Sequence, residues 1–128
     1  MKLLLDTHSF LWFIEGSDKI SLTARRLIED SSNQPLLSMA SLWEMAIKVS
    51  IGRLKLSGAF EELIPEQMRL NGIETLDIQT EHVAEVTRLP FHHRDPFDRL
   101  LIAQAQVEGI PIVGADDTFD AYAITRMW

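Results

Sequence analysis

Short apolar runs alternate with amphipathic stretches along the whole chain. Residues 3–5, 35–38, 74–78, 110–113 and 124–126 form apolar or weakly alternating runs, which are typical of strands. Residues 10–14, 21–29, 40–50, 59–70, 80–89 and 95–107 read as helices, with a break or restart at Pro65, and residues 117–122 as a helical turn. This order predicts an α/β fold of three layers, with a mainly parallel central sheet flanked by helices.

The chain has 128 residues and contains no repeat or linker, so we expect a single domain over residues 1–128. It contains no cysteine, which excludes disulfides, thiolate zinc sites and cysteine nucleophiles, and which suits a cytoplasmic location. The apolar start is interrupted at Asp6. It is therefore too short for a signal peptide or a membrane span, and we expect no membrane association.

Carboxylates follow several of the predicted strands. Asp6 comes directly after the first strand, and Asp116 and Asp117 follow the strand at 110–113. Glu44 and Asp98 lie in early turns of the helices at 40–50 and 95–107. Ligands of parallel sheets bind beyond the carboxyl ends of the strands, so Asp6, Glu44, Asp98 and Asp116 are expected to converge there.

Helix capping is a simpler explanation for any one of these acids. Asp6 could cap the helix after it, Ser41-x-x-Glu44 has the form of a capping box, and Asp95 precedes a proline at the first helical position. Asp117 could cap the last helical turn. Capping alone does not require a glutamate at position 44 or the Asp-Asp pair at 116–117.

As a set, convergent carboxylates are typical of a site for a hard divalent cation. Mg²⁺ and Mn²⁺ prefer oxygen ligands, and such ions promote in-line displacement at phosphodiesters. The four acids, with Asp117 as a possible further ligand, therefore indicate a hydrolase that acts on phosphate esters.

The net charge of −7 argues against a general nucleic-acid binder. Of the 19 acids, 15 remain against 12 bases when the four site candidates are set aside, which leaves −3. Phosphate contacts are then assigned to Lys48, Arg53, Arg94 and Arg99. The alternatives are a solvated surface and a Glu44–Lys48 helix pair. We expect His92 and His93 to be exposed, and Trp12, Trp43 and Met39 to pack in the core.

Four ordered motifs resemble those of PIN-domain proteins, and in particular VapC-type toxins. They are Leu4-Leu5-Asp6-Thr7-His8, Ser41-Leu42-Trp43-Glu44, Asp95-Pro96-Phe97-Asp98-Arg99 and Ile112-Val113-Gly114-Ala115-Asp116. The resemblance implies an Mg²⁺- or Mn²⁺-dependent endoribonuclease in which Asp6, Glu44, Asp98 and Asp116 are the acidic quartet. It also implies a homodimer neutralised by a small antitoxin. Gly114 departs from the Thr or Ser that many family members have there, so a hydroxyl near the last acid is missing.

Two other functions are compatible with the residues. In one, the domain is a catalytically inactive module for dimerisation or partner binding, and the acids are caps. In the other, Asp6 is the nucleophile of a phosphatase that forms an aspartyl phosphate. The second is weakened because no acid stands two residues after Asp6, as haloacid-dehalogenase-like phosphatases require.

Overall fold

Five parallel strands form the central sheet of the computed structural model, which describes residues 1–128. They are β1 (Lys2–Leu5), β2 (Gln34–Ser38), β3 (Glu74–Leu76), β4 (Ile112–Val113) and β5 (Arg126–Met127), in the spatial order β3-β2-β1-β4-β5. β1 is central, and its Leu5 lies opposite Leu37 of β2 and Val113 of β4. All five carboxyl ends therefore point to one edge of the sheet.

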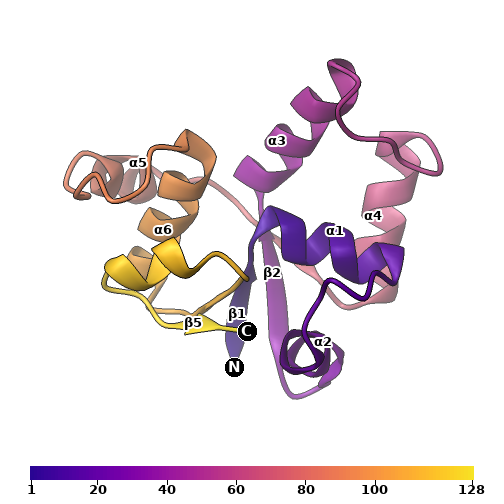
Figure 1. The fold of residues 1–128 in the computed structure, drawn as a ribbon, viewed down its shortest axis with the longest axis horizontal. Coiled ribbons are helices and arrows are strands. Elements are labelled where there is room, and N and C mark those ends of the chain that lie inside the picture. Colours follow the sequence, from indigo (N-terminus) through magenta and orange to yellow (C-terminus); the bar gives the residue numbers. More distant parts are fainter.

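Helices cover both faces of this sheet (Figure 1). One face carries α1 (Thr7–Glu15), α2 (Leu22–Glu29), α3 (Met39–Ser50) and α4 (Phe60–Leu70). The other carries α5 (Thr80–Val86), α6 (Pro96–Glu108) and the short 3₁₀ helix η1 (Asp117–Ala121). The three-layer α/β prediction is confirmed.

Each face has its own hydrophobic cluster. Leu3 and Leu5 of β1 belong to the cluster under α1 to α4, whereas Leu4 belongs to the cluster under α6 and η1. Successive strand residues point to opposite faces, so a strand buried on both sides needs a continuous apolar run. This is the physical reason for the Leu3-Leu4-Leu5 run.

Some predicted boundaries were wrong. α4 runs without a break through Pro65, since the proline costs one backbone hydrogen bond while Ile64 and Met68 on either side of it are buried. The last strand lies at Arg126–Met127 rather than at 124–126, and α5 ends at Val86. No helix combines the length and apolar composition that a bilayer crossing requires.

Candidate active site

The four predicted acids gather at the carboxyl edge of the sheet. Asp6 directly follows central β1, and Asp116 follows the neighbouring β4 after two residues. Glu44 lies on α3, which begins where β2 ends, and Asp98 lies in the first turn of α6. The carboxylates interact across these elements, because Glu44 and Asp6 both act on the ionisation of Asp98, and Asp116 acts on that of Asp6.

Burial and mutual repulsion make ionisation of two of these acids costly. Burial raises the pKa of Asp6 despite its hydrogen bonds to Ser9. Burial, followed by repulsion from Asp95, raises the pKa of Asp98 from 3.8 to about 7, and Glu44 and Asp6 add to this against the opposing effect of His93. A cation in contact with these oxygens would relieve the repulsion.

Asp116 behaves differently because it is more exposed and well bonded. Partial burial acts to raise its pKa, but hydrogen bonds from Thr118 and His93 outweigh it and lower the pKa below 3.8. Asp116 is therefore ionised more readily than Asp98, which holds a proton up to near neutral pH.

Two of the acids do cap helices, but each does so with one oxygen. Asp6 Oδ1 accepts the Ser9 N–H at 2.7 Å, and Asp116 Oδ1 accepts the Thr118 N–H at 2.9 Å. The second oxygen of Asp116 faces the site instead. Capping and ligand binding are therefore compatible in the same carboxylate.

Elsewhere the capping predictions were partly wrong. Asp95 caps α6 as predicted, accepting the N–H groups of Phe97 and Asp98. The capping box at 41–44 is not formed, because α3 begins earlier and its cap is Ser38. The last helical turn is capped by Asp116 rather than Asp117. Because Ser38 caps α3 and Asp95 caps α6, Glu44 and Asp98 have no capping role.

His93 lies between two of the acids, which corrects the expectation that it would be exposed. Its Nε2 is 3.0 Å from Asp98 Oδ2 and 3.1 Å from Asp116 Oδ2, and its ring is 15% exposed. Its Nδ1 accepts the Asp95 N–H at 3.2 Å, so the neutral ring carries its proton on Nε2. His92 is exposed, as predicted.

Three ligand atoms come together at this point. One nitrogen of His93 and one oxygen each of Asp98 and Asp116 all lie within 4.8 Å of one another. This spacing and donor set fit one divalent cation of the Mn²⁺ or Mg²⁺ type, with the nearby Asp6 and Glu44 adding negative charge. Asp117 is exposed and lies outside this group.

The Arg99 side chain is part of the fold, which corrects its assignment to phosphate binding. It is 6% exposed, and its two terminal nitrogens donate to the carbonyl oxygens of Val86, Leu89, Pro90 and His93. Four of its five N–H groups are thereby used. Arg99 fixes the loop that precedes α6, and so holds His93 in place.

Glu44 has its own set of partners. The Thr7 hydroxyl donates to Glu44 Oε1 at 2.7 Å and lies 2.9 Å from the Ser41 hydroxyl. Lys48 Nζ is 3.0 Å from Glu44 Oε2, so the helix pair is present. Lys48 remains 32% exposed, and Arg53 and Arg94 are exposed. All three bases are therefore accessible from solvent, and their contact with phosphates stays a prediction.

Gly114 lies against the Asp6 carboxylate. A Cβ atom at position 114 would be 2.8 Å from Asp6 Oδ2, closer than such atoms approach, and a tight 3.1 Å from its Cγ. A Thr or Ser side chain therefore does not fit here with Asp6 in this position. A hydroxyl reaches the last acid from another position, because the Thr118 hydroxyl donates to Asp116 Oδ1 at 2.7 Å, whereas the Ser9 hydroxyl bonds the Val113 carbonyl.

The surface near the acids is hollowed. Asp6 and Asp116 line a hollow of about 340 Å³ together with His8, Trp12 and Ala115. Trp12 is half-buried against the core and packs on Trp128, whereas Trp43 is 63% exposed and Met39 43% exposed. The prediction that Trp43 and Met39 pack in the core was wrong.

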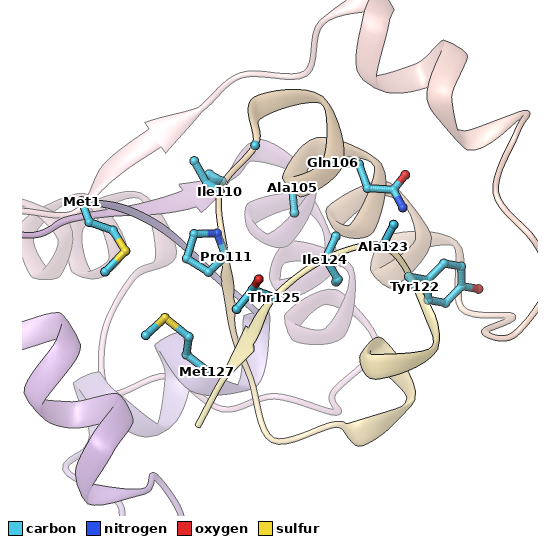
Figure 2. Close-up of a pocket in the computed structure, with 11 residues that line it drawn as sticks. Met1, Ala105, Gln106, Ile110, Pro111, Tyr122, Ala123, Ile124, Thr125 and Met127 are labelled. Atoms are coloured by element: carbon cyan, nitrogen blue, oxygen red, sulfur yellow. The ribbon is translucent and has the colours of Figure 1, made fainter.

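A larger hollow of about 620 Å³ lies near the opposite edge of the sheet (Figure 2). Met1, Pro111 and Met127 surround one end of it, and Gln106 and Tyr122 lie at the other. Pro111 and Thr125 directly precede β4 and β5, so this hollow opens at the amino ends of the strands. It contains no acid and is separate from the candidate site.

Comparison with known proteins agrees with this geometry. The PIN domain family model matches residues 3–124. A curated relative, Ribonuclease VapC16 of Mycobacterium tuberculosis, is 35% identical over 69 residues, which are 54% of this chain and 48% of the relative. The chain thus matches about half the length of that curated relative.

Solved structures share the fold at low identity. The structure of DNA-bound VapBC from Salmonella typhimurium superposes with a TM-score of 0.72 at 17% identity, covering 99% of this chain and 97% of that one. That of VapBC2 from Rickettsia felis bound to a promoter DNA fragment gives a TM-score of 0.71 at 16% identity, covering 99% and 98%. The ordered motifs, the parallel sheet with its acidic edge and the match over nearly the whole chain together show that the protein belongs to the PIN domain family.

Proposed function

We propose that the protein is a divalent-metal-dependent endoribonuclease and the toxin of a toxin–antitoxin pair. The observation that carries this proposal is the convergence of Asp6, Glu44, Asp98 and Asp116 at one edge, with the pKa of Asp98 raised to about 7. Such crowding of acids is costly to a fold and is typical of functional sites. The curated relative is a ribonuclease by name, and one protein of the same fold belongs to a toxin–antitoxin complex from Klebsiella pneumoniae; both support the proposal.

Asp98, Asp116 and His93 would hold the metal ion, with Asp6 and Glu44 around them. The ion would be Mg²⁺ or Mn²⁺, and when bound it would activate water and stabilise negative charge on the phosphodiester. Two carboxylates and one imidazole match the donors that Mn²⁺ accepts, and the oxygen donors match those of Mg²⁺.

The chain's own residues would orient the reaction around this site. Thr7 holds one oxygen of Glu44 by a hydrogen bond at 2.7 Å, so that the other faces Lys48. Lys48, with Arg53 and Arg94, would contact backbone phosphates of the RNA. Without the ion, the Nε2–H of His93 donates between Asp98 and Asp116 and so keeps these two carboxylates together. That proton would have to leave Nε2 for His93 to become a ligand of the ion.

The wider assembly follows from the same proposal. An acidic chain of net charge −7 suits a basic segment of a small antitoxin. A homodimer and a cytoplasmic location stay predictions of the family resemblance. An inactive interaction module remains the rival, since it would keep the caps formed by Asp6 and Asp116 but would bind no metal.

Cleavage of mixed cellular RNA tests the proposal. Purified wild-type protein and Asp98→Asn are compared with Mn²⁺ and with EDTA, and folding is checked by circular dichroism. Cleavage by wild type with metal only is the expected result. Full activity of a folded, pure Asp98→Asn protein would refute the mechanism. No cleavage together with no Mn²⁺ binding by calorimetry would favour the interaction module.

A further inference from the structure

An exposed pair of aromatic rings lies beside the candidate site. Trp43 of α3 and Phe97 of α6 meet edge to face, with ring centroids 5.5 Å apart and planes at 73°. Trp43 is 63% exposed, which is unusual for so large an apolar side chain. The two rings come from helices on opposite faces of the sheet, and they meet where α3 packs against α6.

Each ring is the chain neighbour of a site carboxylate. Trp43 precedes Glu44 and Phe97 precedes Asp98. Glu44 and Asp98 turn inward, at 7% and about a quarter exposed, whereas Trp43 turns to solvent. The aromatic pair therefore borders the acids on the side where α3 and α6 approach each other.

The shape of this surface favours a flat ligand over an inserted side chain. The larger hollows of the molecule are lined by other residues, and Trp43 is largely exposed to solvent. A protein helix usually docks its apolar side chains into a groove. A nucleobase needs only an open aromatic face, and such stacking is a principal means of binding single-stranded RNA.

We propose that the Trp43–Phe97 pair is a stacking platform for an unpaired base beside the scissile phosphate. This inference rests on the proposed ribonuclease function and deepens it, because it assigns two side chains of this chain to binding the base next to the scissile phosphate. A base stacked on Trp43 would place the adjoining phosphate next to Glu44, Asp98 and Lys48. The platform would select for an unstacked nucleotide rather than for one base identity.

A double-mutant cycle that combines protein variants with RNAs lacking one base tests the platform. Single-turnover cleavage of a short unstructured RNA is measured for wild type, Trp43→Ala and Trp43→Phe, with one abasic nucleotide placed at each position around the cleavage point. Leu70→Ala is the matched control, because Leu70 is 61% exposed at the end of α4. Circular dichroism confirms folding of each variant.

We expect one RNA position at which loss of the base slows the wild type roughly 5- to 150-fold in kcat/KM, the range of one base–aromatic stack. Trp43→Ala should show the same loss on intact RNA and no further loss with that abasic RNA. Trp43→Phe should be intermediate, and Leu70→Ala should equal wild type. Equal rates for Trp43→Ala and wild type at every position would overturn the platform.

Two further measurements separate the platform from the nuclease proposal. Fluorescence of the wild type minus that of Trp43→Phe is followed while single-stranded RNA is added in EDTA, where no cleavage is expected. Quenching without any cleavage in Mn²⁺ would support the platform while refuting the nuclease. Absence of quenching would refute the platform. Sedimentation of wild type and Trp43→Ala tests the remaining alternative. If the variant loses a dimer while its RNA cleavage and RNA binding are unchanged, the rings belong to a contact between copies and the proposal is overturned.

Discussion

Replacing Asp98 by Asn should stabilise the protein while abolishing the proposed activity. Ionisation of Asp98 is opposed by burial and by Asp95, Glu44 and Asp6, which raise its pKa from 3.8 to about 7. The amide has no charge to bury. The amide oxygen can still accept a hydrogen bond from the Nε2–H of His93, so the local hydrogen bond is retained.

The magnitude follows from the raised pKa. A pKa change from 3.8 to about 7 corresponds to about 4 kcal/mol of unfolding free energy lost when Asp98 ionises. The side chain is 25% exposed, so screening by water reduces this, and we expect about 2 kcal/mol. The folded state binds the proton more tightly than the unfolded state. Wild-type stability should therefore fall, relative to Asp98→Asn, as pH rises from about 4 to about 7, and the difference should level off above that.

Urea unfolding of both proteins in EDTA, between pH 4 and pH 8, measures this difference. Asp117→Asn is the control, because it removes a charge at the same edge from an exposed side chain outside the cluster. Its stability should stay within about 0.5 kcal/mol of wild type. An Asp98→Asn protein that is no more stable than wild type at pH 8, or a difference that does not vary with pH, would refute the reasoning.

Three other substitutions test separate parts of the site. Gly114→Ala places a Cβ 2.8 Å from Asp6 Oδ2, so it should displace that carboxylate and lower RNA cleavage about 100-fold; unchanged cleavage and Mn²⁺ affinity by calorimetry would contradict this. Arg99→Met removes the bonds to four backbone carbonyls and should cost about 3 kcal/mol in urea unfolding; a fully stable variant with weakened RNA binding would restore the phosphate-binding role. Thr7→Val removes the donor to Glu44 and should lower kcat more than it changes KM in steady-state cleavage; a KM effect alone would argue against orientation.

The layer order and most elements could be predicted because they depend on local patterns. The run Leu3-Leu4-Leu5 requires apolar neighbours on both faces, which only a buried strand provides. The placement of Asp6 and Asp116 followed from the rule that parallel strands end at one edge. These features are fixed by residues close together in the chain.

The contacts that were not foreseen join residues far apart in the chain or involve a loop that has no regular sequence pattern. Arg99 was assigned to RNA because its charge is visible in sequence, whereas the four carbonyls that bind it are supplied by a loop without a regular pattern. His93 had no acid partner within helical spacing; its partner Asp98 is five residues away, and its other partner Asp116 is 23 residues away. The Asp95-Pro96 helix start nearby was the only available signal that this loop is positioned.

Trp43 shows the limit of hydrophobic periodicity. Its neighbours Leu42 and Met45 pack on the core, and an apolar tryptophan between them fits the same pattern. The helix turns about 100° per residue, so position 43 leaves the buried face although its type does not reveal it. An apolar residue that the period places outward is therefore a useful signal of a binding surface.

The two carboxylates that cap helices with one oxygen each also bear on how the protein responds to a shortage of metal ions. Asp6 and Asp116 each bond one oxygen to the backbone of their own helix, so the helices need no ion to be complete. Unlike a small zinc domain, whose fold collapses under a chelator, this chain should keep its shape through metal starvation. The proposed activity would then return on resupply at the speed of ion binding, without any refolding step. The metal-free protein can therefore accumulate in its folded form.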